Sequence, residues 1–408
     1  MRCGLLGRKL GHSYSPQIHS YLGDYSYTLF EKEPEEVEAF LKSGSFDGIN
    51  VTMPYKQAVI PYLDALSPVA EALGAVNTIV RRPDGRLVGH NTDYFGFQQM
   101  LMASGLSVTG KKVLVLGTGG ASKPVAAVLR AQGANVVSIS RSGEDNYANL
   151  SRHSDASVIV NTTPVGMYPN NGTSPLSLEL FPALEGVLDI IFNPARTQLM
   201  LDAEQRGLIA VGGLRMLVAQ AKEAAEWFTG RSIPDEKIQN IFQILTRQMQ
   251  NIVLIGMPGC GKTTIAALLG QKLGRTVVDA DAEIIRLAGK SIPEIFAQDG
   301  EEGFRSLETQ VLQMLGKQSG LIISTGGGCV TQPRNHPLLH QNGILFWLQR
   351  NWELLPTHGR PLSQANSLAE MYRIRKPLYQ SFADREIGNN GALEQAVSAI
   401  IQYLEGNL

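Results

Sequence analysis

The feature that most constrains the fold is a glycine-rich run in the middle of the chain, GMPGCGKTT at residues 256–264. The run fits the pattern G-x-x-x-x-G-K-[ST], follows the apolar stretch 251–255 and precedes the helix-like stretch 265–273. This strand–turn–helix setting is what a phosphate-binding P-loop requires, because backbone N–H groups of the turn and of the helix start surround the phosphates. We therefore predict that Lys262 reaches the outer phosphates and that Thr263 holds Mg²⁺. The residues expected around the nucleotide are Gly256, Gly259, Gly261, Lys262, Thr263 and Thr264.

The rest of the chain alternates between strand-like and helix-like runs, which indicates an α/β fold with parallel sheets. Its 408 residues exceed what one ordinary core uses, so about two to three domains are expected. We expect an α/β domain with a late hairpin at residues 1–100, and a second α/β domain at 101–230 whose last helices return to the first. A helical linker is expected at 231–250, and the P-loop domain, with its own parallel sheet, at 251–408.

The bulk composition argues against several classes of partner. A net charge of −1 argues against nucleic acid or an anionic membrane as the main partner. No apolar run approaches the roughly 20 residues of a membrane span, and the N-terminal apolar stretch is too short for a signal peptide. Three cysteines, Cys3, Cys260 and Cys329, indicate a reducing compartment without a disulfide framework, so a cytoplasmic location is expected. The oligomeric state is left open.

A second glycine-rich turn lies upstream, in VLVLGTGGASKPVAAVL at residues 113–129. It again joins a strand-like run to a helix-like run, as in dinucleotide-binding units, although Ser122 occupies the third glycine position of G-x-G-x-x-G. The next strand-like run leads to Arg141 without an acidic residue, and an arginine at that point suits the 2′-phosphate of NADP. Lys123 could add to the same positive patch, and a solvated surface charge is the alternative for Arg141. The residues expected at the cofactor are Gly117, Gly119, Gly120, Ala121, Ser122 and Arg141.

Four short runs in the first part of the chain place polar side chains at strand ends or just before a helix. GHSYSPQIH carries Ser13 and Ser15, whose hydroxyls and helix start could receive a carboxylate; simple N-capping is the alternative. The other runs are NVTMPYK, GAVNT and HNTDYFG, which carry Thr52, Lys56, Asn77 and Asp93. A lysine and an aspartate at strand ends could form a proton-transfer pair, and a surface salt bridge is the alternative.

Together these runs resemble the shikimate dehydrogenase family, and the resemblance extends over residues 1–246 through NTTPVGM, DIIFNPARTQL and GGLRMLVAQ. It implies a substrate-binding domain, a Rossmann-like NADP-binding domain, and reduction of 3-dehydroshikimate with NADPH. At matching positions Ser13 and Ser15 would hold the substrate carboxylate, and Lys56 and Asp93 would be the catalytic pair, with Lys56 supplying the proton. The residues that would bind the substrate hydroxyls are Thr52, Asn77 and Gln220. Phe192 stands where the family usually has a tyrosine.

Downstream of the P-loop, further runs carry charges suited to phosphoryl transfer. VVDADAEI places Asp279 and Asp281 at a strand end, where carboxylates can hold Mg²⁺ and orient an attacking hydroxyl; helix capping is the alternative. IISTGGG, residues 322–328, ends a strand in three glycines, which lets a ligand approach the backbone closely. Three separated arginines suit a carboxylate and a phosphate, because the guanidinium fork binds both bidentately, although each alone could be a surface charge. They are Arg305, Arg360 and Arg375.

This second set resembles shikimate kinase over residues 251–405. The resemblance implies ATP and Mg²⁺ as cofactors, with Asp279 near the metal and with Lys262 and Asp281 as catalytic residues. Asp281 would bind and orient the shikimate 3-hydroxyl, and Arg360 would close over the site from a lid that is shorter than in many relatives. The residues that would hold shikimate are Arg305, Gly327, Gly328, Arg360 and Arg375.

The two resemblances fit one another, because the product of the first activity is the substrate of the second. The chain is therefore interpreted as a bifunctional shikimate pathway enzyme of aromatic amino acid biosynthesis. Two alternatives stay open. A dehydrogenase that prefers quinate and NAD could be joined to a kinase for another small polyol acid, or the kinase half could be a catalytically weak, ATP-sensing module.

Overall fold

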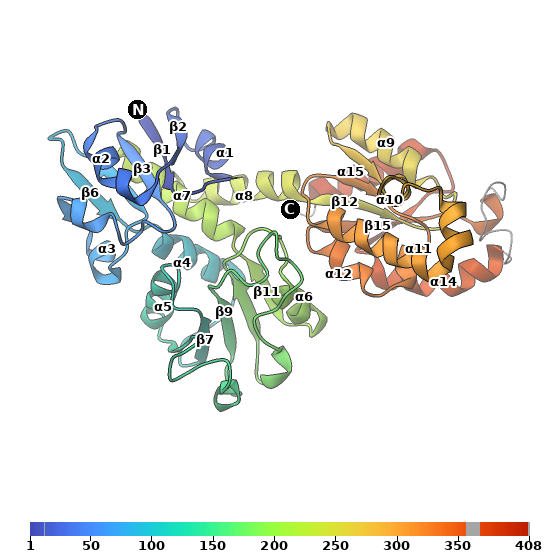
Figure 1. Ribbon diagram of the computed structural model, residues 1–408, viewed down its shortest axis with the longest axis horizontal. Helices are drawn as coiled ribbons and strands as arrows, with labels where there is room; N and C mark the ends of the chain where they lie inside the picture. The colour runs from blue at the N-terminus through green and yellow to red at the C-terminus, as the bar shows by residue number, and fades with distance from the viewer. Residues whose placement is uncertain (12, 356–367, 407–408) are drawn as a thin grey trace. The chain divides into compact units, whose positions relative to one another are not determined.

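The computed structural model describes residues 1–11, 13–355 and 368–406. The chain divides into two compact units (Figure 1). The first unit consists of Met1–Met167, Thr173–Asn193 and Leu199–Phe242, and the second consists of Tyr168–Gly172, Pro194–Gln198 and Gln243–Leu408. Two sheets are built from strands of the first unit and one from strands of the second, so the expected α/β class with parallel sheets is confirmed.

The first sheet of the first unit is mixed, with the strand order β2-β1-β3-β5-β6-β4. Its strands are β1 (Arg2–Gly7), β2 (Ser26–Glu31), β3 (Gly48–Val51), β4 (Ala65–Leu66), β5 (Thr78–Arg81) and β6 (Leu87–His90). The helices between them are α1 (Ser15–Ser20), η1 (Pro34–Glu36), α2 (Val37–Lys42), η2 (Ile60–Tyr62) and α3 (Pro68–Leu73). The expected late hairpin is the antiparallel pair β5 and β6, and Gly85 closes its turn with a positive φ of 86°.

A helix from the end of the first unit packs on this first sheet. Phe228 of α7 (Leu214–Thr229) lies against Gly48, where a β-carbon would come within 2.4 Å of its ring. Cys3, Val80 and Ala224 complete the small core at this contact. Gly48 thus allows the helix to approach the sheet, and the same helix carries Gln220.

The second sheet of the first unit is entirely parallel and has the order β11-β10-β9-β7-β8. Its strands are β7 (Lys112–Leu116), β8 (Asn135–Ile139), β9 (Val158–Asn161), β10 (Gly186–Asp189) and β11 (Ile209–Gly212). The accompanying helices are α4 (Asp93–Ser104), α5 (Ser122–Ala131), η3 (Leu150–His153), η4 (Leu178–Leu180) and α6 (Gln198–Gln205). The chain leaves β7 on one side to form β8 and returns on the other as β9, so a ligand crevice is expected at the carboxyl ends of β7 and β9.

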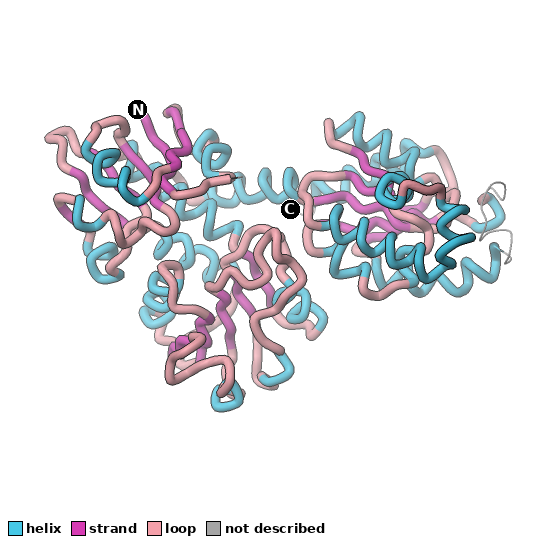
Figure 2. Tube along the Cα trace, viewed as in Figure 1, coloured by secondary structure: helices cyan, strands magenta, loops and turns pink. Residues whose placement is uncertain are grey.

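The sheet of the second unit is also parallel, with the order β13-β14-β12-β15-β16, and helices lie on both of its faces (Figure 2). Its strands are β12 (Asn251–Ile255), β13 (Val277–Asp279), β14 (Ile322–Ser324), β15 (Gly343–Gln349) and β16 (Arg385–Gly388). The long helices are α9 (Lys262–Leu273), α10 (Ala280–Ala288), α11 (Ile292–Gly316), α14 (Leu368–Phe382) and α15 (Leu393–Gly406), while α8 (Glu236–Met249) begins in the first unit and ends in the second. The shorter ones are η5 (Cys329–Thr331), α12 (Asn335–His340) and η6 (Trp352–Leu354). The central strand β12 is buried at every position, as expected for a parallel strand covered on both faces.

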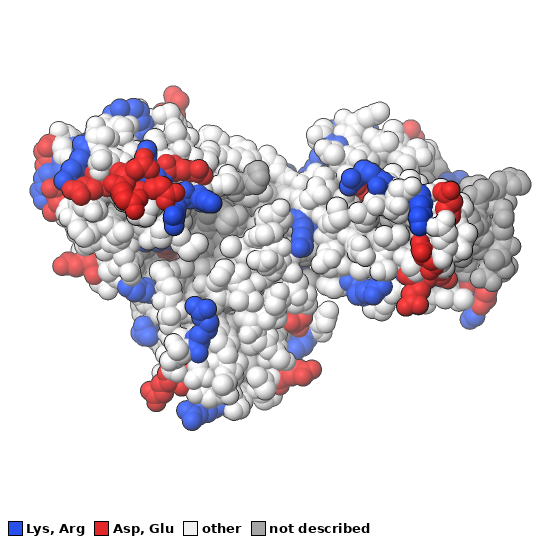
Figure 3. Space-filling model, viewed as in Figure 1, with Lys and Arg blue, Asp and Glu red and all other residues white. Residues whose placement is uncertain are grey.

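Charged side chains of both signs are dispersed over the face drawn in Figure 3, with a group of acidic ones around α2. Glu36 of η1 pairs with Lys32 at 3.1 Å, and Glu38 of α2 pairs with Lys42 at 2.5 Å. Exposed pairs of this kind add little to stability, because water screens them. Among the described residues, none of the helices combines the length and the apolar composition needed to cross a lipid bilayer.

Candidate active sites

The first unit contains a cavity of about 1250 Å³ that residues from both of its sheets line. The predicted residues that line it are Ser13, Ser15, Thr52, Lys56, Asn77, Asp93, Gly117, Gly119, Gly120, Ala121, Arg141 and Gln220. Ser122 was expected there too but is not a lining residue. It is buried beneath the loop, where its hydroxyl donates to the carbonyl of Gly119 at 2.6 Å.

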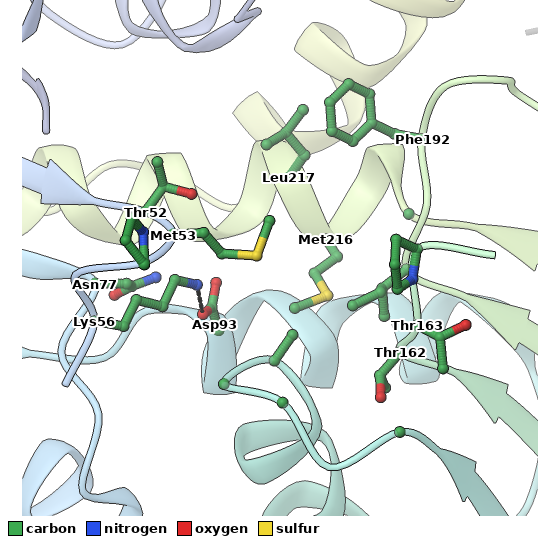
Figure 4. Close-up of a pocket in the computed structure, with 18 of the residues that line it drawn as sticks. Thr52, Met53, Lys56, Asn77, Asp93, Thr162, Thr163, Phe192, Met216 and Leu217 are labelled. Atoms are coloured by element: carbon green, nitrogen blue, oxygen red, sulfur yellow. Dashed lines mark hydrogen bonds and ion pairs between the residues drawn. The ribbon is translucent and has the colours of Figure 1, made fainter. Parts of the chain in front are cut away.

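Lys56 and Asp93 form the charged centre of this cavity (Figure 4). Lys56 Nζ donates to Asp93 Oδ2 at 2.5 Å, and the two side chains are 18% and 10% exposed. The carbonyl of Lys56 accepts from Val76 N at 2.7 Å, which fixes the lysine backbone. Asp93 opens α4, where the helix dipole favours a negative charge, and Asn91 Oδ1 accepts its backbone N–H. The surface salt bridge considered from the sequence is therefore excluded, because this pair is largely buried within a cavity.

The two serines lie at another part of the cavity wall. Ser13 Oγ accepts the backbone N–H of Ser15 at 3.2 Å, so Ser13 forms a local turn before α1 and also lines the cavity. Close by, the ring of Phe192 meets Tyr14 edge-to-face at a centroid separation of 5.9 Å. Phe192 thus packs against an aromatic ring at the cavity wall.

Gln220 reaches the cavity because helices α4 and α7 pack very closely. A β-carbon on Gly96 of α4 would lie 2.8 Å from the carbonyl oxygen of Met216 and 3.0 Å from the β-carbon of Gln220. Only glycine allows this approach, which places Gln220 beside the turn that carries Asp93. Thr92 Oγ1 lies 3.3 Å from Gln220 Oε1 and 3.1 Å from Asn77 Nδ2, so one buried hydroxyl joins both amides.

The glycine turn after β7 faces the same cavity. Gly117 has a positive φ of 102° and lies so close to Thr162 and Thr163 that a β-carbon would come within about 3.1 Å of both. At Gly119 a β-carbon would project into open space, and at Gly120 it would lie 3.9 Å from Cδ of Lys56. The turn is therefore a cradle that side chains would fill, which suits a pyrophosphate at the start of α5. It also stands directly beside Lys56.

Arg141 follows β8 at the rim of the cavity and is exposed. Burial raises the pKa of Tyr147, and the nearby positive charge of Arg141 opposes that shift. Lys123 does not line the cavity; its Nζ lies 3.9 Å from where a β-carbon on Gly74 would stand. Arg141 thus lines the cavity that holds the glycine turn, whereas Lys123 does not.

Several cavity residues were not predicted from the sequence, and Figure 4 shows how they complete the walls. Met53 extends from the loop that holds Thr52, while Thr162 and Thr163 come from the end of β9 opposite. Phe192, Met216 and Leu217 are also labelled in this view and line the cavity. The sequence run NTTPVGM contains both threonines and could have pointed to them. In the structure Asn161 Oδ1 accepts hydrogen bonds from the backbone N–H and the hydroxyl of Thr163.

In the second unit, the P-loop joins β12 to α9 as predicted. Gly256, Gly259 and Gly261 all have positive φ values, of 146°, 81° and 99°. Lys262 Nζ donates to the carbonyls of Gly256 at 2.8 Å and Met257 at 3.0 Å, so the ammonium lies inside the loop. Thr264 is exposed at the first turn of α9. The loop therefore has the glycine conformations and the lysine that a phosphate cradle needs.

Thr263 and Asp279 come together at the carboxyl ends of the strands. Thr263 Oγ1 donates to Asp279 Oδ2 at 2.9 Å and lies 3.3 Å from Ser324 Oγ. Asp279 Oδ1 accepts the N–H groups of Asp281 and Ala282, so the aspartate also caps α10. A hydroxyl and a carboxylate in contact fit Mg²⁺, which binds a few protein oxygens together with substrate phosphates. Within the described residues no cluster of three His, Cys, Asp or Glu side chains could form an all-protein metal cage.

A buried charge cluster lies beside the triple glycine. Arg305 is 4% exposed and donates to Glu308 Oε2 at 2.8 Å and Glu301 Oε1 at 3.2 Å. A β-carbon on Gly326 would lie 2.7 Å from Glu308 Oε1 and 2.9 Å from Asp281 Oδ1. Burial raises the pKa of Glu308, although Arg305 opposes the shift. Asp281 and Arg305 thus approach the same short glycine segment, as expected for one binding site.

The other two glycines complete this arrangement. A β-carbon on Gly328 would lie 2.3 Å from the guanidinium of Arg305, and one on Gly327 would lie 2.6 Å from the ring of Pro258 in the P-loop. The carbonyl of Gly327 accepts from Arg375 Nη1 at 3.1 Å and from the Tyr379 hydroxyl at 2.5 Å. The triple glycine therefore connects the P-loop with two of the predicted arginines. The third, Arg360, lies outside the described residues.

The cysteines are all buried and free. Burial raises the pKa of the Cys3 and Cys329 thiols to about 12. Such thiols stay protonated near neutral pH and are weak nucleophiles, so they act as small apolar residues.

The comparisons with known proteins identify relatives for both halves of the chain. Residues 5–79 match the family model of the shikimate dehydrogenase substrate binding domain, and residues 258–405 match the model of shikimate kinase. A shikimate dehydrogenase (NADP(+)) of Clostridium perfringens is 36% identical over 264 residues, which are 59% of this chain and 97% of that protein.

Solved structures match the same N-terminal portion. A shikimate dehydrogenase from Peptoclostridium difficile is 36% identical with a TM-score of 0.56, covering 60% of this chain and 97% of that one. A chorismate mutase/shikimate 5-dehydrogenase fusion protein from Clostridium acetobutylicum is 35% identical with a TM-score of 0.57, covering 60% of this chain and 96% of that one.

Proposed function

The chain belongs to the shikimate dehydrogenase family and carries a shikimate kinase domain after it, and from this premise we propose two consecutive reactions. The first unit reduces 3-dehydroshikimate to shikimate with NADPH. The second unit transfers a phosphoryl group from MgATP to the 3-hydroxyl of shikimate. The chain is thus a bifunctional shikimate pathway enzyme whose second substrate is its first product.

The observation that carries the dehydrogenase step is the Lys56–Asp93 pair beside the glycine turn. Bound NADPH supplies the hydride to the substrate carbonyl carbon. Lys56 Nζ donates the proton to the carbonyl oxygen, which becomes the new hydroxyl. Asp93, 2.5 Å from that ammonium, holds Lys56 in position and accepts a hydrogen bond from the adjacent substrate hydroxyl. Lys56 Cδ lies 3.9 Å from the position of a β-carbon on Gly120. This short distance supports the proposal that the proton donor and the cofactor act on the same carbonyl group.

The remaining cavity residues orient the substrate in this proposal. Ser13 and Ser15 bind its carboxylate, and Thr52 binds a hydroxyl together with the amides of Asn77 and Gln220. All five line the cavity that contains Lys56. Arg141 binds the 2′-phosphate of the cofactor and so selects NADP over NAD.

The kinase step rests on the P-loop and the triple glycine. Lys262 stabilises the charge on the transferred phosphoryl group, and Thr263 and Asp279 would hold Mg²⁺. Asp281 accepts the hydrogen bond of the attacking hydroxyl and orients it. Arg305 and Arg375 bind the shikimate carboxylate beside the backbone of Gly327 and Gly328. Their proximity to that backbone supports this assignment.

A mass-resolved time course tests both steps in one tube. The purified chain is given 3-dehydroshikimate, NADPH and MgATP, and each cofactor is omitted in turn. We expect shikimate to rise first and its phosphate to follow, while omission of ATP stops the sequence at shikimate. A Lys262→Ala chain should also stop at shikimate and serves as the matched control.

Other outcomes separate the alternatives. Shikimate without phosphate, together with thermal stabilisation by ATP, would establish the second unit as an ATP-sensing module. Faster turnover of quinate with NAD than of shikimate with NADP would identify the first unit as a dehydrogenase that prefers quinate and NAD. A reducing compartment such as the cytoplasm fits the three free cysteines.

A further inference from the structure

A continuous chain of buried hydrogen bonds runs behind the hydroxyl-binding side of the dehydrogenase cavity. Asn50 Nδ2 lies 3.1 Å from Thr78 Oγ1, which lies 3.2 Å from Asn77 Oδ1. Asn77 Nδ2 lies 3.1 Å from Thr92 Oγ1, which lies 3.3 Å from Gln220 Oε1. Thr78 and Thr92 are completely buried. The two threonines therefore touch no solvent, and their hydroxyls contact these amides and, at 3.4 Å, each other.

The direction of each bond follows from which groups can donate. The backbone N–H of Thr92 can only donate, and it lies 2.7 Å from Asn77 Oδ1, so this end of the Asn77 amide is the oxygen. Asn50 Nδ2 donates to the Thr78 hydroxyl, whose own hydrogen then goes to the same Asn77 oxygen. That oxygen now accepts two bonds, which fills both of its lone pairs.

The hydroxyl of Thr92 accepts from Asn77 Nδ2 and has two amide oxygens within reach of its single hydrogen, Asn77 Oδ1 at 3.2 Å and Gln220 Oε1 at 3.3 Å. The Asn77 oxygen already accepts from the Thr92 N–H and the Thr78 hydroxyl, which favours Gln220 Oε1 as the acceptor. Gln220 Nε2 in turn donates to the carbonyl of Leu217 at 3.0 Å. Each amide keeps one further N–H hydrogen, and both residues line the cavity.

We propose that Thr92 is a positioning residue that fixes the Asn77 and Gln220 amides so that both present N–H donors to the substrate. The substrate hydroxyl oxygens accept at these two positions, and a hydroxyl hydrogen remains for the carboxylate of Asp93. Thr92 itself does not line the cavity, so it acts only through the two amides. The inference rests on the proposed dehydrogenase function and extends it to the recognition of the hydroxyl groups.

The test compares Thr92→Val, which keeps the branched shape but removes the hydroxyl, with Thr92→Ser, which keeps the hydroxyl. Steady-state oxidation of shikimate with NADP⁺ gives KM and kcat for each variant. We expect Thr92→Val to raise the KM for shikimate about tenfold, the factor of one neutral hydrogen bond, and to change kcat by less than about threefold. The KM for NADP⁺ should not change, because Thr92 does not contact the glycine turn, and Thr92→Ser should restore the parent KM for shikimate.

A double-mutant cycle with Gln220→Leu shows whether Thr92 acts through that amide. In the Gln220→Leu background the added Thr92→Val change should raise KM by less than about threefold, because one of the two amides that Thr92 fixes is already gone. Full additivity, or a Thr92→Val variant with the parent KM, would overturn the inference while the wild-type chain still turns over shikimate. A wild-type chain that does not interconvert shikimate and 3-dehydroshikimate would overturn the proposed function and this inference together.

Discussion

Lys56 Nζ lies 2.5 Å from Asp93 Oδ2, although 37 positions separate the two residues in the chain. Lys56 stands in the loop after β3, and Asp93 opens the helix that leads into the second sheet. The pair therefore joins the loop after β3 of the first sheet to the helix that precedes the second sheet. Both side chains are largely buried, so neither is free to serve as an ordinary surface charge.

Removal of the lysine should abolish proton donation while leaving the fold of the second unit intact. We expect Lys56→Ala to lower kcat for reduction of 3-dehydroshikimate by roughly 10²- to 10⁴-fold, the usual contribution of a general acid. Phosphorylation of shikimate by the same preparation, followed by mass spectrometry, is the control. Reduction at the parent rate would remove Lys56 from the mechanism.

The motifs that end strands could be predicted from the sequence, because parallel strands bring their carboxyl ends to one edge of a sheet. Thr52 and Lys56 follow β3, and both line the cavity. Asn77 lines it too, because it precedes β5, which runs antiparallel to β3 and so begins at the edge where β3 ends. The P-loop was predictable for a stronger reason, since Gly256 and Gly261 occupy conformations with positive φ that few other residues adopt.

Contacts that depend on packing between distant elements could not be predicted in the same way. Phe192 gave no sign of its contact with Tyr14, because that depends on how the loop after β10 returns toward α1. Thr92 has no distinguishing sequence feature between Asn91 and Asp93. Its hydroxyl reaches the Gln220 amide only because α4 and α7 approach each other closely. Ser122 fits a cofactor contact by sequence position, but its hydroxyl bonds back to Gly119.

Gly328 provides a steric test of the kinase site. A β-carbon there would lie 2.3 Å from the Arg305 guanidinium, which Glu308 and Glu301 hold in place. We expect Gly328→Ala to raise the KM for shikimate in the phosphorylation assay at least about tenfold, because a displaced arginine loses a charge-assisted hydrogen bond to the substrate. Dehydrogenase activity should not change.

Gly406→Ala is the matched control for this substitution, because no atom lies within 4 Å of a β-carbon at that position. It should phosphorylate shikimate like the parent chain. If Gly328→Ala also does so, with an unaltered KM, then Arg305 is not held against the substrate by this glycine.

Arg141 should decide the choice between the two nicotinamide cofactors. We expect Arg141→Ala to raise the KM for NADPH about ten- to hundredfold, the factor for a hydrogen bond to a charged group, and to leave weak NADH use unchanged. Initial rates with each cofactor measure this. Lys123→Ala is the control, because Lys123 does not line the cavity and should leave both KM values alone. An equal response of NADPH and NADH to Arg141→Ala would show that the arginine does not read the 2′-phosphate.

His19 should set the acid stability of the first unit. Burial lowers its pKa to about 3 from the ordinary value of 6.5, and its ring stacks on Tyr27 at a centroid distance of 4.0 Å. Between these two pKa values the unfolded chain binds a proton that the folded chain does not, so stability is complete above pH 6.5 and falls as the pH is lowered. Each pH unit in this range lowers the free energy of unfolding by about 1.4 kcal/mol, which amounts to about 2 kcal/mol by pH 5.

Urea unfolding followed by loss of dehydrogenase activity at pH 7.5 and pH 5.0 measures the difference. In His19→Gln the difference between the two pH values should shrink by about 2 kcal/mol, whatever the variant's absolute stability. The same difference in the variant and the parent chain would mean that His19 is protonated in the folded state.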